Sequence, residues 1–218
     1  MSKIIKKLLR EGLMSEMSIS NISLQDFNVK EIAKSWLLSS SETPVHMFKY
    51  EMQSDYHLSP EEKDNLMDMD EDEILEMPRF KSWLVYEVES KIDDFISDIQ
   101  NYINNDDTIT IWREMTVDDK WIQSLPREAK RLGRFWSFEQ DAAEAHWGGA
   151  GKLIQIQTSV KQNYIDWTQT IIANIDPQIG EDEKEITLFK NTPIRIEALI
   201  IDNEDIDVSG LRNKVFKA

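Results

Sequence analysis

Residues 108–115 have the sequence TITIWREM, in which side chains alternate in the manner of a β-strand. Successive side chains of a strand point to opposite faces of a sheet, so this pattern predicts a half-buried strand. Residues 153–160 (LIQIQTSV) repeat it, and residues 185–190 and 194–202 give two further predicted strands. A turn cluster at 104–107 precedes the first of these strands. The second half of the chain is therefore expected to be a compact unit built mainly on strands.

The first half of the chain has helical patterns instead. Residues 2–13 predict a basic amphipathic helix, which can bind acidic or membrane surfaces or dock on its own domain. A short helix is expected near 30–38, and Ser59-Pro60-Glu61-Glu62 has the form of a capping box at a helix start. Residues 80–103 predict one long core-facing helix, since apolar residues recur there at three- and four-residue steps.

These patterns together predict an α+β fold in two parts. Residues 1–105 are expected to form a helical N-terminal region, and residues 106–218 a domain with a split mixed β-sheet. Within that domain, residues 138–147 predict a helix closed by Gly148-Gly149, and residues 164–174 predict a helix or a long turn.

Composition excludes several classes of protein. The 218 residues carry a formal net charge of −16, which argues against nucleic acid as a direct partner. The chain has no cysteine, so disulfides, thiolate metal sites and cysteine nucleophiles are excluded. No apolar run is long enough to span a membrane, and the first residues do not resemble a secretory signal. We therefore expect a cytoplasmic protein that does not enter membranes.

The acidic segment after residue 60 invites a calcium-loop interpretation, because Asp68, Asp70 and Asp72 alternate. A calcium loop needs a glycine at its turn, which is absent here, and a bidentate glutamate where this chain has Arg79. The segment is better interpreted as a solvated acidic face, and no metal site is predicted.

Four features of the second half follow one another in a fixed order. Arg113 lies inside the first predicted strand, and residues 135–137 (FWS) come directly after Gly133 and before an alanine-rich stretch. A strand pair separated by a loop is next, and residues 183–188 (EKEITL) then lead two glutamates into a strand. This order resembles the ADP-ribosyltransferase fold of the Arg–Ser–Glu class, over roughly residues 106–202.

The second motif of the chain, residues 132–137 (LGRFWS), is similar to that of phage-encoded members of this class. The Ser-Thr-Ser element of the family is Ser137-Phe138-Glu139 here, so only its first serine is kept. The resemblance implies that NAD is the substrate and that no metal takes part.

The resemblance also implies roles for single residues. Arg113 would contact the diphosphate of NAD, and Ser137 would hold the nicotinamide ribose and Glu185 in register. Glu185 would stabilise the positive charge that develops on the ribose, and Glu183 would orient the acceptor and favour loss of its proton. Independently of the resemblance, flat cationic rings stack well on indoles, so Trp136, Trp147 and Trp167 are expected to line the nicotinamide pocket.

Each of these residues also has a structural interpretation. Arg113 can form an ion pair with a nearby glutamate, and Ser137 can cap the predicted helix at 138–147. Glu183 can be one more charge on an acidic loop, and Trp136 can be a core residue.

The sequence therefore predicts a mono-ADP-ribosyltransferase that transfers ADP-ribose from NAD to a protein acceptor and releases nicotinamide. Arginine is one candidate acceptor side chain, and a host protein in the bacterial cytoplasm is the expected partner if the chain is phage-encoded. The alternative is a catalytically inactive module of the same fold that serves as a phage structural or interaction protein. A weaker third hypothesis is an acidic mimic of nucleic acid, motivated by the net charge of −16.

Overall fold

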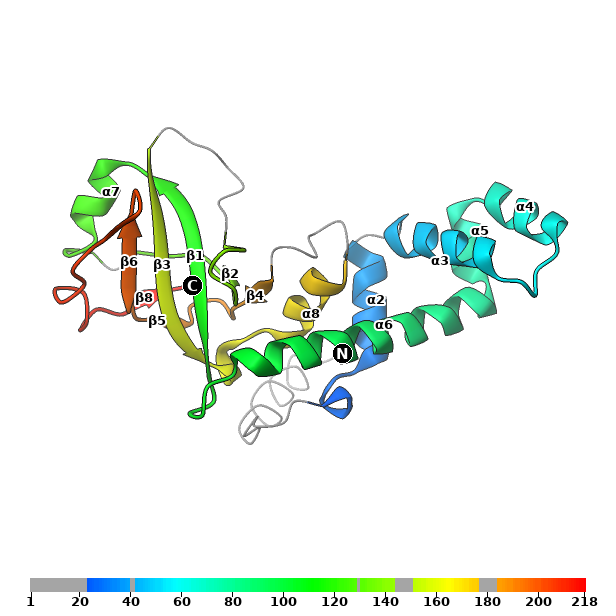
Figure 1. Cartoon of the computed structure of the whole chain (residues 1–218), viewed down its shortest axis with the longest axis horizontal. Helices are drawn as coiled ribbons and strands as arrows, with labels where there is room; N and C mark the ends of the chain where they lie inside the picture. The colour runs from blue at the N-terminus through cyan, green and yellow to red at the C-terminus, as the bar shows by residue number, and fades with distance from the viewer. Residues whose placement is uncertain (1–22, 40–41, 129, 144–150, 177–183) are drawn as a thin grey trace, which may run out of the picture. The chain divides into compact units, whose positions relative to one another are not determined.

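The computed structural model describes residues 23–39, 42–128, 130–143, 151–176 and 184–218 (Figure 1). These residues form two compact units. A helical unit takes in residues 23–97 and the segment that begins at Ile171, and a sheet unit takes in residues 98–170 and the chain after 182. The predicted helix at 2–13 lies outside the described residues.

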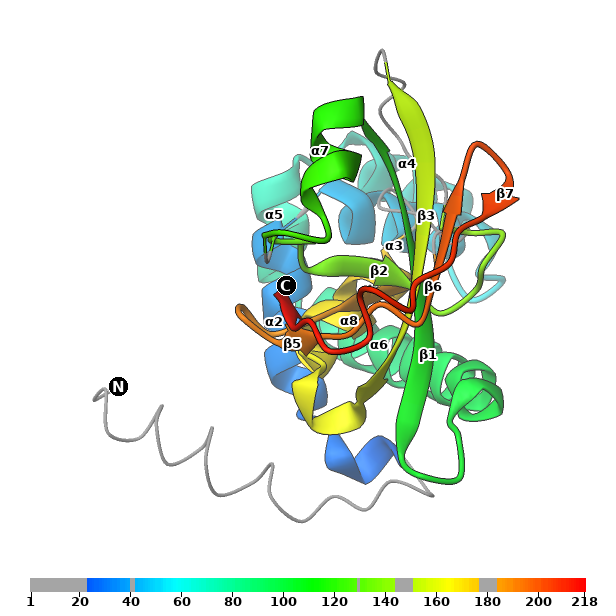
Figure 2. The same cartoon turned by 90° about the vertical axis from the view of Figure 1, so that its left-hand side faces the viewer.

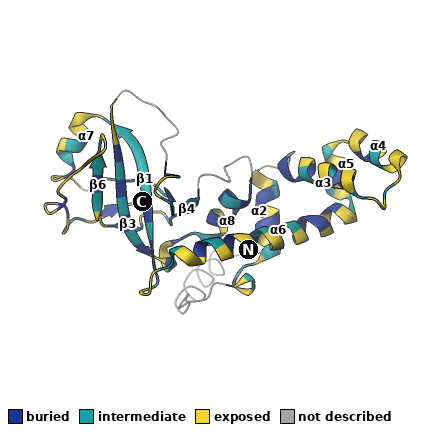
Figure 3. Cartoon of the chain, in the orientation of Figure 1, coloured by how far each residue is buried: buried dark blue, intermediate teal, exposed yellow. Residues whose placement is uncertain are grey.

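The sheet unit is built around two long strands, β1 (Thr108–Val117) and β3 (Lys152–Lys161). They pair antiparallel over their whole length, from Thr108↔Lys161 to Val117↔Lys152, and Figure 2 shows them side by side. Burial alternates along β3, where Ile154, Ile156, Thr158 and Val160 are buried, as Figure 3 shows for the strand as a whole. The alternation in the sequence therefore predicted both strands correctly.

Shorter strands extend the sheet on both sides. They are β2 (Phe135–Ser137), β4 (Glu185–Thr187), β6 (Ala198–Ile201) and β7 (Glu204–Asp205), and the order is β4-β2-β1-β3-β6-β7. All paired strands in the described residues run antiparallel, so the mixed strand directions that we expected are wrong. β2 and β3 flank β1 and both run opposite to it, so each hydrogen-bonded pair of strands is antiparallel although not every connection reverses the chain.

The predicted strand at 194–202 is divided in the structure. Its first part is β5 (Pro193–Ile194), which pairs with β8 (Phe216–Lys217) in a separate two-stranded sheet. Its second part is β6, which pairs with β3. The amide of Glu197, between the two parts, bonds the carbonyl of Gln157 at 2.9 Å, so the chain changes sheets at this point.

The helix predicted at 138–147 is wrong for the residues that the structure describes, because 138–143 form bends and turns. The amide of Phe138 donates to the carbonyl of Lys184 at 3.0 Å, and the Phe138 side chain is fully buried. This tertiary pairing overrides the local preference for a helix. Residues 144–147 lie outside the described residues.

The helical unit contains α2 (Val29–Ser39), α3 (Glu42–Ser54), α4 (Pro60–Asp68), α5 (Glu71–Glu76) and α6 (Pro78–Ile99) up to Ser97. The predicted capping box at Ser59 and Glu62 is present. Asp70 forms a second capping box with Glu73, so one of the alternating aspartates is a helix cap.

Aromatic side chains form part of the core of the helical unit. The ring centroid of Phe48 lies 5.3 Å from the centroid of Phe80 and 5.3 Å from that of Trp83. The Trp83 indole donates a hydrogen bond to Glu51 Oε2 at 2.6 Å. Further along α6, Ile92 is fully buried. The predicted helix at 80–103 is therefore present as α6 followed by a short 3-10 turn, Gln100–Tyr102.

Two further α-helices lie in the described residues, beside the short 3-10 helices Leu24–Asp26 and Gln162–Tyr164. α7 (Asp119–Ser124) follows β1 and is capped by Asp118, which accepts from the amide of Trp121 at 2.7 Å. α8 (Trp167–Ile175) confirms the helical alternative predicted around Trp167. No helix in the described ranges is long and apolar enough to span a membrane.

Candidate functional site

The centre of the candidate site is a row of three side chains across adjacent strands of the sheet unit. Trp112 in β1 is the register partner of Ser137 in β2, and Ser137 is the register partner of Glu185 in β4. Register partners project from the same face of a sheet, so these three side chains share one face. Ser137 and Glu185, which are far apart in the sequence, are therefore direct neighbours.

The carboxylate of Glu185 is held by a neighbour on its own strand. The hydroxyl of Thr187 donates to Glu185 Oε1 at 2.7 Å, which is possible because residues two apart on a strand share a face. Thr187 is itself fixed: its amide donates to the Thr170 hydroxyl at 3.0 Å, and both residues are buried. The donor that holds Glu185 is thus part of the core.

Ser137 is buried, and its hydroxyl accepts a hydrogen bond from the amide of Glu139 at 3.1 Å. A hydroxyl has one proton to donate besides its acceptor positions, so this contact leaves the proton available. Ser137 does not cap a helix, since the described residues after it form turns. Its side chain is therefore set on the face that it shares with Glu185.

Arg113 follows Trp112 in β1, at the point where pairing between β1 and β2 stops, and it therefore projects from the opposite face of the sheet to Trp112 and Ser137. Its Nη1 donates to the carbonyl of Phe135, and the guanidinium lies against Gly133. Gly133 has a φ of +87°, and a Cβ at this position would lie 2.9 Å from Arg113 Cζ. A glycine is needed here both for the backbone conformation and for the space that the guanidinium occupies.

Burial lowers the pKa of the Arg113 guanidinium, and the negative charge of Glu185 acts in the opposite direction. The Nε atom of Arg113 is buried and has no hydrogen-bond partner among the described residues. A buried donor without an acceptor is costly, so this atom is a candidate to donate to an anionic ligand.

Trp136 lies on the opposite face from Ser137, because the two residues are consecutive in β2. It is buried, and its indole donates to the carbonyl of Gly133 at 2.9 Å. The structure therefore does not bring Trp136 to the face that carries Ser137 and Glu185. Glu183 and Trp147 lie outside the described residues, and Trp167 lies at the start of α8.

A second cluster adjoins the row and was not predicted from the sequence. Tyr102 donates a hydrogen bond to Glu139, and its ring packs edge-on against Phe138 with centroids 4.9 Å apart. The bond to Glu139, with smaller effects of burial and of nearby negative charge, raises the pKa of Tyr102 to about 12. These contacts hold the two residues that follow Ser137.

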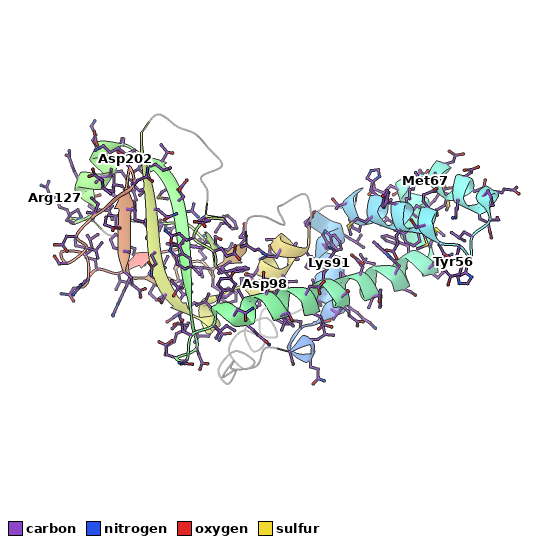
Figure 4. All side chains as sticks on the ribbon, viewed as in Figure 1. Tyr56, Met67, Lys91, Asp98, Arg127 and Asp202 are labelled. Carbon is purple, nitrogen blue, oxygen red and sulfur yellow. The ribbon has the colours of Figure 1, made fainter. Side chains whose placement is uncertain are left out.

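The lysine between the two glutamates of the EKEITL motif is also held. Lys184 Nζ pairs with Asp98 Oδ2 at 2.8 Å and lies 5.9 Å from the centroid of Phe138. Asp98, labelled in Figure 4, lies near the C-terminal end of α6. Lys184 has a φ of +47°, so the backbone just before Glu185 adopts the left-handed region.

The spacing of Thr187 from Glu185 could have shown from the sequence that they share a strand face. Tyr102 and Asp98 had no such signal, because their contacts join segments that are far apart in the chain.

No group of His, Cys, Asp and Glu side chains in the described ranges is arranged to hold a metal ion.

Comparison with known proteins gives no relative. No protein-family model matches the chain, and no curated protein or solved structure matches it either.

Proposed function

We propose that the chain is an NAD-dependent mono-ADP-ribosyltransferase that transfers ADP-ribose to a protein acceptor and releases nicotinamide. The observation that supports this proposal best is the direct pairing of Ser137 with Glu185 on adjacent strands. Arg113 lies on the neighbouring strand and projects from the opposite face of the sheet, but the negative charge of Glu185 acts on its guanidinium. The three residues that the sequence motifs single out come from three separate segments of one sheet. Ligand sites are commonly built in this way, from a few polar groups of distant chain positions.

In the proposed reaction, the bond between the nicotinamide nitrogen and C1′ of the ribose breaks, and its electron pair leaves with nicotinamide. Positive charge then develops on the ribose, as in glycoside hydrolysis. Glu185, fixed by Thr187, would stabilise that charge, and the Ser137 hydroxyl would position the ribose on the same face. Arg113 would contact the diphosphate.

A nucleophile of the acceptor then forms the new bond to C1′ and loses its proton. The resemblance assigns the orientation of that nucleophile to Glu183, with an arginine side chain as a candidate acceptor. The proposal places the reaction in the cytoplasm of a bacterial host, where NAD and protein acceptors are both present.

The test is incubation of the full chain with labelled NAD and bacterial lysate, with nicotinamide release measured in parallel. We expect a labelled protein band with the wild-type chain and none with Glu185→Gln. Nicotinamide release without a labelled band would indicate an NAD hydrolase. Absence of both would contradict the proposal and favour the inactive interaction module.

A further inference from the structure

Four exposed cationic side chains surround the two-stranded sheet of β5 and β8, which Figure 1 shows side by side. We call this set the basic face; its members are Arg131, Lys190, Arg195 and Lys217. Lys217 is the register partner of Pro193 in β5 and forms a parallel bridge with Arg131. Three segments far apart in the sequence therefore meet at this sheet.

Backbone contacts fix the three segments against one another. The amide of Leu132 donates to the carbonyl of Lys217 at 2.8 Å, and the amide of Lys217 donates to the carbonyl of Lys130 at 3.3 Å. The amide of Asn191, next to Lys190, donates to the carbonyl of Ala218 at 3.2 Å. The positions of these cations are thus set by the fold.

Burial shows that the cations in the three segments share a side. Leu132, Ile194, Ile196 and Phe216 are buried, whereas the residues between or beside them, Arg131, Arg195 and Lys217, are exposed. This is the alternation of a sheet with one buried and one open face. Arg131 and Lys217, as bridge partners, present their charges side by side.

Like charges directly opposite each other on paired strands destabilise a sheet. The arrangement is notable in a chain with 41 Asp and Glu residues, where carboxylates are plentiful. Nearby cations do have carboxylate partners: Lys130 pairs with Glu128 at 3.4 Å and Arg134 with Asp166 at 3.5 Å. No member of the basic face forms an ion pair with a carboxylate in the part of the chain that the structure describes.

Two glutamates close to the basic face in the sequence have their contacts elsewhere. Glu197 is two residues beyond Arg195, and its Oε2 accepts from the Ser159 hydroxyl at 2.8 Å. Glu128 is already paired with Lys130. Stability therefore does not explain the basic face, because neutral or acidic residues at these positions would remove the repulsion.

We propose that the basic face docks an acidic segment of a protein partner. A nucleic acid has the right sign of charge but is a poorer fit, because its phosphates extend along the whole polymer. Without these four cations, the formal charge of the chain falls from −16 to −20, and this field repels any polyanion that extends beyond the basic face. A short acidic segment can end where the basic face ends.

Two members of the basic face lie next in the sequence to strands of the candidate site. Arg131 precedes β2, which carries Ser137, and Lys190 follows β4, which carries Glu185. A partner docked at the basic face is therefore held by the segments that flank the two strands of the candidate site. The docking itself does not depend on NAD turnover, so it can be tested whether or not the chain is an enzyme.

The test measures fluorescence anisotropy of a labelled oligoglutamate peptide with the full chain, at low and at physiological ionic strength. The variant Arg131→Glu/Arg195→Glu/Lys217→Glu should bind at least about tenfold more weakly than wild type, since reversed charges repel the probe. The matched control Lys30→Glu/Lys34→Glu/Lys120→Glu makes the same change in net charge at exposed lysines elsewhere. Its affinity should stay close to that of wild type.

An oligothymidylate of the same net charge is measured beside the peptide. Tighter binding of the oligothymidylate would overturn the proposal in favour of nucleic acid. No binding of the peptide at low salt, or equal losses in the two triple variants, would overturn it as well.

Stability gives a second and independent readout. Lys217→Glu places a carboxylate opposite Arg131, so it should raise the melting temperature while it weakens binding of the peptide. A fall in melting temperature would show that Lys217 has a structural role and would count against the proposal. If the triple variant fails to fold, the neutral pair Arg195→Gln/Lys217→Gln is used for the binding comparison.

Discussion

Ser137 lies directly opposite Glu185 on paired antiparallel strands, and both side chains project from the same face of the sheet. The pairing joins Ser137, which ends β2 just before a series of turns, to a glutamate at the start of a three-residue strand. Each strand alone is too short to be stable, so the pair depends on β1 beside it. The geometry of the candidate site is therefore a property of the whole sheet.

Glu185→Gln keeps the shape of the side chain and one hydrogen-bond acceptor but removes its negative charge. If Glu185 stabilises the charge that develops on the ribose, NAD hydrolysis and transfer should both fall by ~100-fold or more. NAD binding should change little, because the diphosphate contact is assigned to Arg113. Steady-state kinetics and calorimetric NAD binding measure the two effects. Unchanged turnover would remove Glu185 from the mechanism.

Thr187→Val removes the hydroxyl that donates to Glu185 Oε1 and keeps the branched shape that the buried site needs. A loosely held carboxylate should lower kcat by roughly tenfold with KM nearly unchanged, since the lost contact acts on orientation. Thr187→Ser, which restores the hydroxyl, is the matched control and should recover kcat. Equal kcat in the valine and serine variants would contradict this role.

Gly133→Ala adds a Cβ that would lie 2.9 Å from both Cζ and Nη2 of Arg113, at a backbone φ of +87°. The guanidinium must move, and the backbone strain costs about 1–2 kcal/mol. We expect a lower melting temperature and a raised KM for NAD. Gly210→Ala is the matched control, because a Cβ there meets no atom within 4 Å. A normal KM for NAD in Gly133→Ala would show that Arg113 does not contact the substrate.

Ile92→Asp puts a carboxylate at a fully buried position of α6. Burying an isolated charge and deleting an apolar side chain should together destabilise the protein by ~3 kcal/mol or more. Denaturant unfolding measures the change, and Asp93→Asn on the exposed side of the same helix is the control. An unchanged free energy of unfolding would contradict the core position of Ile92.

Local patterns predicted the long elements well. β1 and β3 follow from alternation over residues 108–115 and 153–160, although each observed strand is ten residues long, and α4 follows from its capping box. The same kind of reasoning failed after Ser137, where a predicted helix gave way to turns. That outcome depends on the bond from the amide of Phe138 to the carbonyl of Lys184, and no local signal indicates a contact between residues so far apart.

For the candidate site too, local sequence patterns did not indicate the tertiary contacts. The motifs placed Ser137 before a predicted helix and Glu185 at the start of a strand, and the sheet register made the two residues neighbours. The expected place of Trp136 in the nicotinamide pocket did not take into account that consecutive residues of a strand face opposite sides. Tyr102 lies outside every motif, and only the folded chain brings it to Glu139.

The bond between Tyr102 and Glu139 makes a prediction about alkaline pH. Because this bond raises the pKa of Tyr102 from 10.0 to about 12, the protonated tyrosine is favoured in the folded state. The contribution of this hydrogen bond to the free energy of unfolding is fully present below pH ~10 and is lost as the pH rises from about 10 to about 12. Tyr102→Phe keeps the ring that packs on Phe138 and removes only the donor.

The free energy of unfolding of Tyr102→Phe should therefore be lower than that of wild type by about 1 kcal/mol at neutral pH, the usual value of one hydrogen bond. This difference should shrink as the pH rises above about 10 and be lost before the pH reaches about 12. Denaturant unfolding of both proteins across this range measures it, and the titrations that the two proteins share cancel in the comparison. A difference that stays constant to pH 12 would show that Tyr102 and Glu139 are not coupled.

Glu139→Gln tests the same bond by removing the charge of the acceptor. It should lower the pKa of Tyr102 toward 10, so that tyrosinate absorbance appears at a lower pH than in the wild type.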